Sequence, residues 1–273
     1  IECGPSVTLP YLTDALDHLG IGDVATVAVT HIHLDHAGGA GHLARQFPGA
    51  RVAVHDAGAR HLIDPARLWK SATRIYGEDG MAQMWGPMEP IDRGRLHVLA
   101  EGSTIPLGDG TALEVMYTPG HAVHHVVVSD PGTGAMFVGD AVGLAFPHGH
   151  LVQPNTPPPD LDPPALVAQL HRMAEREPQW LGFAHFGVHS NPSRAFDEAE
   201  QRLDDWLRYA AALPRDEETA ADQLRDWVLS GYRDEGFDEE MVDTYDKNTF
   251  WPMHVTGMWR WLDSLDDGVT ERD

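Results

Sequence analysis

The chain has 273 residues, of which 42% are hydrophobic, a formal net charge of −23 at pH 7 and one cysteine. One cysteine excludes an intrachain disulfide framework and the cysteine-rich class of zinc modules. The negative charge opposes nucleic-acid binding, because phosphate backbones attract basic surfaces. No run of about 18 apolar residues occurs, so no membrane-spanning helix is expected. No signal-peptide pattern is visible either, which favours a cytoplasmic location.

Short apolar runs separated by Gly, Pro and Asp predict alternating strands and helices along the first two thirds of the chain. Strands are expected at residues 24–29, 51–54, 96–99, 103–107, 112–117, 125–129, 135–138 and 180–184, and helices at 39–47, 57–63 and 164–175. This order is typical of an α/β (α+β) fold.

After about residue 192 the apolar residues follow helical spacing, first in 203–210 and then in 224–232. The Trp-rich segment 250–262 follows. We therefore expect a catalytic domain over residues 1–192 and a C-terminal helical subdomain over residues 193–273. The apolar faces of these helices would pack on the catalytic domain, line its substrate pocket or form a homodimer.

Six residues directly after the strand at 24–29 contain four side chains that bind metals. They are His31, His33, Asp35 and His36. Imidazole and carboxylate groups at this density suit zinc, iron or manganese. A purely structural role is disfavoured, because each buried polar side chain would need its own partner.

Three later residues have the same character, and each follows a short apolar or β-prone run. They are His121 after Thr118-Pro119-Gly120, Asp140 after Phe137-Val138-Gly139, and His185 after Phe183-Ala184. Each is weak alone, since the chain contains 17 His. Together with the first cluster, they predict a metal site at the ends of several strands.

In this order the motifs resemble the metallo-β-lactamase superfamily over about residues 1–195. The resemblance implies a four-layer αββα sandwich, here with a C-terminal helical extension. Strands of that fold normally precede residue 1, and the chain does not begin with Met, so N-terminal strands are expected to be missing. The chain is most similar to the glyoxalase-II-like and lactonase-like branch, and within it to a poorly characterised subgroup with a Pro-rich loop such as residues 156–160.

The resemblance also implies a binuclear metal centre that binds zinc, with manganese and iron as alternatives. One ion would be bound by His31, His33 and His121, the other by Asp35, His36 and His185, and Asp140 would bridge them. A metal-bridging hydroxide would attack a carbonyl carbon or phosphorus atom. Asp35 would be the catalytic residue, because its carboxylate can orient the nucleophile and carry a proton to the leaving group.

The expected activity is hydrolysis of a small-molecule ester, thioester, lactone or phosphoester. Lactonases of the superfamily have a Tyr shortly after the bridging Asp, where this chain has residues 141–144 without one. Glutathione thioesters are disfavoured by the acidic C-terminal region with its scattered Arg residues. The alternatives are an iron-dependent oxidoreductase, such as a sulfur dioxygenase, and a degenerate binding protein, although no ligand position is eroded.

Two segments are candidates for substrate recognition. Residues 69–90 mix Trp, Tyr and Met with polar residues, which suits either an insertion above the metals or a dimer contact. Residues 141–164 are rich in Pro and follow Asp140, so they predict a stiff loop at the rim of the site.

The remaining residues with polar or reactive side chains carry weaker signals. His125 is a candidate for supporting a metal ligand, and a further group of histidines could line the pocket. This group comprises His148, His150 and His189. Cys3 is expected to be a small buried residue, and His254 is expected to be a surface or packed residue. Glu2 is expected to do no more than form a turn or be solvated.

Overall fold

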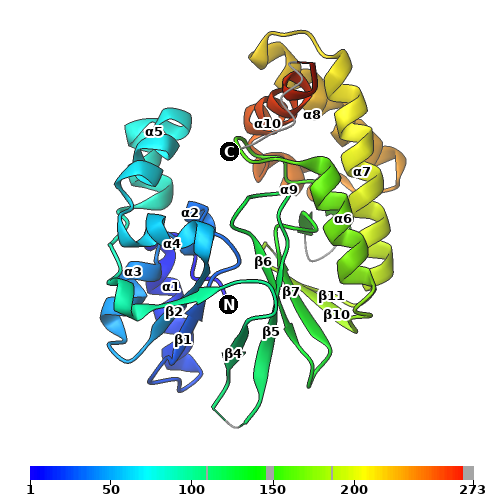
Figure 1. The fold of residues 1–273 in the computed structure, drawn as a ribbon. Coiled ribbons are helices and arrows are strands. Elements are labelled where there is room, and N and C mark those ends of the chain that lie inside the picture. The colour runs from blue at the N-terminus through cyan, green and yellow to red at the C-terminus, as the bar shows by residue number, and fades with distance from the viewer. Residues whose placement is uncertain (109, 146–150, 186, 267–273) are drawn as a thin grey trace. The chain divides into compact units, whose positions relative to one another are not determined.

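The structure is a computed structural model, and it describes residues 1–108, 110–145, 151–185 and 187–266 (Figure 1). His148 and His150 lie outside the described residues. The chain forms two compact units. The first combines Ile1–Thr118 with His124–Gly132, and the second combines Pro119–Val123 with the chain from Thr133 onward. The domain boundary expected at residue 192 stays a prediction.

A three-stranded parallel sheet forms one part of the first unit, in the order β1-β2-β3. Its strands are β1 (Thr26–Ala28), β2 (Arg51–His55) and β3 (Leu96–Leu99). The helices α3 (Ala40–Gln46) and α4 (Asp56–Ile63) follow β1 and β2 along the chain. Apolar side chains of these elements share one buried core, which explains why their sequences read as continuous apolar runs.

Three antiparallel strands also belong to this unit. They are β4 (Thr104–Pro106), β5 (Ala112–Tyr117) and β6 (Val126–Asp130), and β5 pairs with both neighbours. Val126 also donates its backbone N–H to the Thr30 carbonyl, at 2.8 Å. This hydrogen bond fixes the start of β6 against the segment that follows β1.

The segment 69–90, which the sequence singles out as an insertion or a dimer contact, is largely helical. Helix α5 spans Ala66–Gly80, and a π-helical turn, η2, spans Met81–Trp85. Their aromatic and Met side chains form a small apolar cluster with Leu34. The other helices of the unit are η1 (Ser6–Thr8), α1 (Leu9–His18), α2 (Leu34–Ala37) and η3 (Arg93–Arg95).

In the second unit, β10 pairs in parallel with β7 and antiparallel with β11. These strands are β7 (Ala135–Gly139), β10 (Trp180–Phe183) and β11 (Gly187–His189). The short strands β8 (Leu144–Ala145) and β9 (Val152–Gln153) pair with each other, and α6 (Pro163–Ala174) precedes β10.

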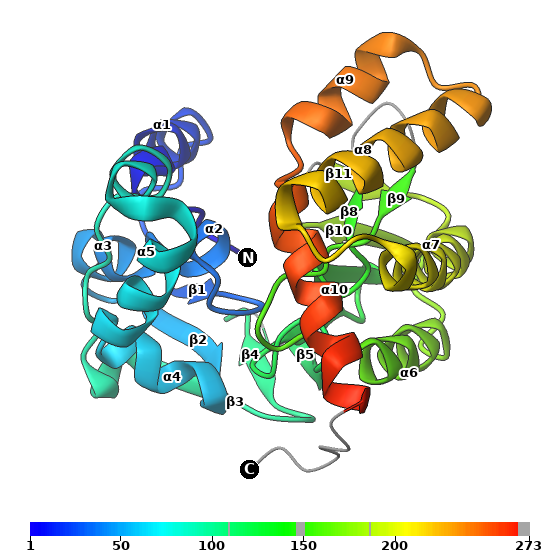
Figure 2. The ribbon, with the colours of Figure 1, turned by 90° about the horizontal axis from the view of Figure 1, so that it is seen from above.

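Four helices of the described residues complete the second unit (Figure 2), and the spacing of apolar residues predicts all of them except the third. They are α7 (Pro192–Ala212), α8 (Glu217–Asp234), α9 (Glu239–Lys247) and α10 (Trp251–Asp266). Carboxylate or amide side chains cap the first three helices, at Asn191, Asp216 and Asp238. Helix α10 packs against α7 and α8 around a core rich in aromatic residues. None of the described helices is long and apolar enough to cross a membrane.

Candidate metal centre

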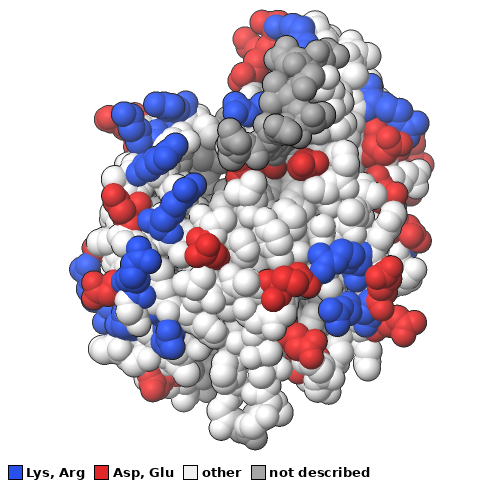
Figure 3. Space-filling model, viewed as in Figure 1, with Lys and Arg blue, Asp and Glu red and all other residues white. Residues whose placement is uncertain are grey.

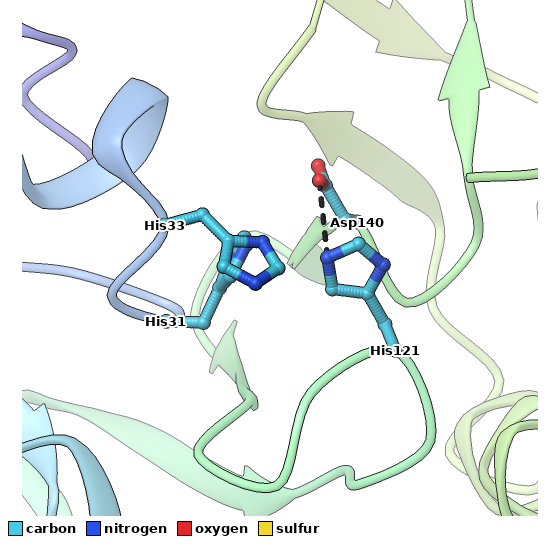
Figure 4. A group of neighbouring side chains, drawn as sticks. All are labelled: His31, His33, His121 and Asp140. Carbon is cyan, nitrogen blue, oxygen red and sulfur yellow. Dashed lines mark hydrogen bonds and ion pairs between the residues drawn. The ribbon is translucent and has the colours of Figure 1, made fainter. Parts of the chain in front are cut away.

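His31 and His33 lie on the loop between β1 and α2, with their rings side by side (Figure 4). The ring centroids are 4.4 Å apart, and His31 Nε2 lies 2.9 Å from His33 Nδ1. His31 is fully buried, and its other ring nitrogen contacts the Thr30 hydroxyl at 3.0 Å. Two nitrogen lone pairs that converge in this way can bind one ion.

Asp35 and His36 follow on the short helix α2, where their side chains lie close to each other. His36 Nε2 lies 3.5 Å from Asp35 Oδ2, while His36 Nδ1 lies 3.3 Å from Glu2 Oε1. His36 is buried, whereas the Asp35 side chain keeps 32% of its surface exposed. A buried imidazole with a carboxylate behind it is a common arrangement of metal-binding histidines, because the carboxylate fixes the ring and its tautomer.

Glu2 has a structural role that the sequence does not indicate. Its carboxylate accepts hydrogen bonds from the Thr30 hydroxyl at 2.5 Å and from the Thr30 backbone N–H at 3.2 Å. Ligand atoms of Glu2, His31 and His36 all lie within 4.8 Å of one another. The expectation that Glu2 does no more than form a turn is therefore wrong, because the carboxylate joins the end of β1 to His36.

His121 belongs to the second unit and is positioned by an unusual backbone. Gly120, directly before it, has φ +134°, and an added Cβ would lie 2.5 Å from the Leu166 nitrogen of α6. Glycine is therefore required for this close approach. The Gly120 carbonyl also accepts a hydrogen bond from the Asp162 N–H at 2.7 Å, which ties the His121 loop to the beginning of α6.

The two ring nitrogens of His121 have different partners. Nδ1 lies 3.2 Å from the Asn155 carbonyl oxygen, and Nε2 lies 3.5 Å from Asp140 Oδ2 (dashed line in Figure 4). A carbonyl oxygen can only accept, so Nδ1 carries the proton. Nε2 is then left with its lone pair toward Asp140, as a metal ligand requires.

Asp140 is the centre of the second group of donors. It follows β7 and is 2% exposed. His185 Nε2 lies 3.5 Å from Asp140 Oδ1, and Asn155 Nδ2 donates a hydrogen bond to Asp140 Oδ2 at 2.8 Å. Within the second unit the structure thus brings together all three ligands that the sequence predicts there. Asn155 was missed, because the Pro-rich loop was recognised without any indication of which residue contacts the site.

The neighbouring histidines support the fold of each unit. The His125 ring packs at 5.0 Å from that of His31, and its Nδ1 lies 2.8 Å from the Thr118 hydroxyl oxygen. His189 is buried, and its Nδ1 accepts the Asn191 backbone N–H at 3.3 Å.

Burial and nearby charge change the pKa of three side chains. Burial, with a smaller contribution from Glu2, raises the pKa of the Cys3 thiol to about 12, so the thiol stays protonated. Burial and then the negative charge of Asp35 raise the pKa of Tyr76 to about 12. Burial, followed by the influence of His121, lowers the pKa of His254 to about 3.

Comparison with known proteins agrees with these motifs. The family model of the metallo-beta-lactamase superfamily matches residues 1–185. The metallo-beta-lactamase fold-containing protein ST1585 of Sulfurisphaera tokodaii is 32% identical over 200 residues, which cover 69% of this chain and 72% of that protein. A crystal structure of ST1585 has a TM-score of 0.61 and covers 74% of each chain.

Of two other similar proteins, one is named as a hydrolase and the other was crystallised with bound iron. The hydroxyacylglutathione hydrolase of Nitrosococcus oceani is 32% identical over 114 residues, which cover 41% of this chain and 32% of that enzyme. TTHA1623, whose crystal structure is of a di-iron-bound form, has a TM-score of 0.50 and 26% identity, and the match covers 66% of this chain and 78% of the other. The matches confirm the superfamily resemblance and its mixed α/β fold with additional C-terminal helices.

Proposed function

Because the chain belongs to the metallo-β-lactamase superfamily, we propose that it is a hydrolase that uses two divalent metal ions. Their ligands would be His31, His33, Asp35, His36, His121, Asp140 and His185. This proposal takes the ligand set that the sequence predicts, with Asp140 as the ligand shared by both ions.

The observation that carries the proposal is how the imidazole rings are held within each unit. His36 has a carboxylate oxygen of Glu2 at Nδ1, and His121 has the Asn155 carbonyl at Nδ1. In both residues the opposite nitrogen faces an aspartate, at 3.5 Å. Outer partners of this kind orient metal ligands and raise their basicity.

The donor set fits divalent ions of a hydrolase. It consists of neutral imidazole nitrogens and carboxylate oxygens, which bind zinc, manganese or iron. When bound, two such ions supply hydroxide near neutral pH and positive charge for the oxygen under attack. Four of the proposed ligands, His31, His36, His121 and Asp140, are buried, whereas His33, Asp35 and His185 are partly exposed.

Asp35 is the residue that we propose to move a proton. Its side chain is the most accessible of the carboxylates discussed, with 32% of its surface exposed, whereas Asp140 has 1%. An exposed carboxylate can reach both a water molecule and a leaving group. The buried carboxylate of Asp140 is instead fixed between Asn155 and His185.

The substrate class is proposed to be a small ester, thioester, lactone or phosphoester, without glutathione recognition by the C-terminal helices. Four Arg residues of that region are each paired with an acidic side chain. The pairs are Arg208 with Asp204, Arg215 with Asp263, Arg225 with Asp246, and Arg233 with Glu239. A carboxylate of glutathione would have to displace one of these acids.

A second candidate function is oxidation chemistry with iron. The di-iron-bound form of TTHA1623 favours it, because that structure is similar to this chain. The same imidazole and carboxylate donors accept iron as well as zinc. An oxidoreductase would need no leaving-group proton from Asp35, which separates the two candidates experimentally.

The proposal is tested on the zinc-loaded protein with a panel of lactone, thioester and phosphodiester substrates. Wild type should hydrolyse at least one of them. Asp35→Asn should lower kcat by at least about 100-fold, since general acid–base catalysis contributes at least that much. Asp56→Asn, at another helix N-terminus, is the matched control and should keep full activity. Metal content is measured for every variant.

Two outcomes would contradict the hydrolase assignment. One is a protein with bound zinc that turns over no substrate of the panel. The other is an Asp35→Asn variant that hydrolyses its substrate as fast as wild type.

A further inference from the structure

Asn155 contacts two of the proposed metal ligands of the second unit, Asp140 and His121. Its side-chain amide donates to Asp140 Oδ2 at 2.8 Å, and its backbone carbonyl lies 3.2 Å from His121 Nδ1. Asn155 thus joins two ligands that come from different loops of the unit. The amide nitrogen must face Asp140, because the amide oxygen would meet a carboxylate there and neither group could donate.

The orientation of the Asn155 side-chain amide lowers the free energy of unfolding. Among the described residues, Asn155 Oδ1 is buried and has no hydrogen-bond partner. A buried acceptor without a partner is unfavourable for folding. Such groups in a folded protein call for another explanation, and here the explanation is the contact of the same side chain with Asp140.

The C-terminal helices hold the segment that contains Asn155. Thr156 donates its backbone N–H to Nδ1 of His254 at 3.2 Å, and both residues are buried. Gly257 lies one turn further along α10, and an added Cβ there would lie only 2.0 Å from the Thr156 carbonyl oxygen. Helix α10 therefore contacts the backbone directly beside Asn155.

A second buried connection lies two residues before Asn155. The Gln153 amide accepts a hydrogen bond from the Tyr232 hydroxyl at 2.8 Å and donates one to the Thr249 hydroxyl at 2.9 Å. The Tyr245 hydroxyl also donates to the Leu151 carbonyl at 2.7 Å. Side chains of helices α8, α9 and α10, together with Thr249 between α9 and α10, thus hydrogen-bond residues 151–156.

We propose that Asn155 is a positioning residue of the metal centre, and that the C-terminal helices act on the centre by holding Asn155 in place. The inference rests on the proposed function, since it requires that His121 and Asp140 bind metal. Asn155 directs one Asp140 oxygen while the other faces His185. Its carbonyl fixes the tautomer in which His121 Nε2 can bind an ion.

The test uses Asn155→Leu in the full chain, because leucine keeps nearly the same shape but cannot donate to Asp140. Asn155→Ser is a second variant with less steric demand. Asn248→Ala is the matched control, since Asn248 is exposed at the end of α9 and its amide donates to the Thr244 carbonyl of the same helix. Co²⁺ affinity is measured by competition with a chelator, together with the visible absorption spectrum of bound Co²⁺ and the melting temperature of the metal-free protein.

The expected result is a loss of about 10- to 100-fold in affinity for at least one Co²⁺ ion, as is typical when an outer partner of a ligand is removed. The Co²⁺ spectrum should change as well, because the geometry around Asp140 changes. The melting temperature of the metal-free Asn155 variants should stay close to that of wild type. The cost of losing the hydrogen bond to Asp140 is offset by the removal of the orphaned amide oxygen. The control should match wild type in all three measurements.

The outcomes separate the two proposals. Wild-type Co²⁺ affinity and spectrum in a folded Asn155→Leu or Asn155→Ser variant would overturn the positioning role while leaving the metal site intact. Wild-type protein that binds no Co²⁺ would overturn the proposed metal function and the inference with it. A third outcome is that both variants have a lower Co²⁺ affinity and a lower melting temperature than wild type, with an unchanged Co²⁺ spectrum. That outcome would assign Asn155 a structural role and overturn the inference.

Discussion

At the scale of single residues, the sequence reveals the candidate ligands but not what holds them. Three of the ligands stand within the four residues from His33 to His36, so their proximity is a property of the local sequence. Their partners are distant along the chain: Asn155 is 34 residues from His121. Glu2 and Asn155 carry no motif of their own, and only the folded chain brings them to the rings.

His254 provides a pH-dependent test of its burial. Its pKa is lowered from 6.5 to about 3 by burial and by His121, and its ring lies close to those of Trp206 and Trp251. Above pH 6.5 the ring is neutral in both the folded and unfolded states. Below that value the unfolded state binds the proton first, so stability falls as the pH drops from 6.5 toward 3.

We expect this one residue to remove about 2 kcal/mol of folding free energy between pH 7 and pH 5. His254→Asn keeps an acceptor for the Thr156 N–H but cannot titrate. Urea unfolding of the metal-free protein at both pH values should therefore show a smaller loss for the variant than for wild type. Equal losses would mean that His254 is not buried in its neutral form.

At the scale of secondary structure elements, the apolar runs of the first two thirds of the chain were predicted well. The helix expected at residues 39–47 is α3 (Ala40–Gln46), and the strand expected at 51–54 is β2 (Arg51–His55). Such elements bury apolar side chains along most of their length, which makes their periodicity visible. Helices α7, α8 and α10 of the C-terminal region were predicted for the same reason.

Several helices were not predicted, and for two of them, α5 and α9, the reason is identifiable. Helix α5 contains Gly77 with φ 69°, a break that together with its polar residues resembles a loop. Helix α9 buries only Val242 and Tyr245, so its apolar periodicity is too short to detect. Its acidic first turn and capping Asp238 stabilise it locally instead.

The contact between α10 and the Asn155 segment can be tested with two glycines that occupy helices of the same unit. Gly257→Ala should destabilise the metal-free protein by about 1–3 kcal/mol, as overpacking does, because its Cβ meets the Thr156 backbone. It should also weaken metal binding. Gly231→Ala in α8 meets no atom within 4 Å and should be neutral or stabilise by up to about 1 kcal/mol.

Urea unfolding and chelator competition measure the two effects separately. A Gly257→Ala variant that is as stable as wild type and binds metal equally well would show that α10 does not press against Thr156. A large destabilisation by Gly231→Ala would instead indicate that alanine is unfavourable in these helices for a general reason.

At the scale of the whole molecule, the charge argues against a nucleic-acid-binding protein. The net charge is −23, and on the face in Figure 3 the Lys and Arg side chains are interspersed with Asp and Glu. Interspersed charges of both signs suit a soluble surface better than a phosphate-binding one. The superfamily could be predicted from four short motifs, whereas the substrate could not, because no motif in the chain specifies it.

The central claim is that the chain binds two ions and uses them for hydrolysis. Elemental analysis of protein purified without added metal, combined with hydrolysis assays before and after chelation, tests this claim most directly. The account predicts about two zinc or manganese ions per chain, and hydrolysis that the chelator abolishes and added zinc restores. One iron per chain, with oxygen uptake in the presence of a persulfide and no hydrolysis, would contradict it.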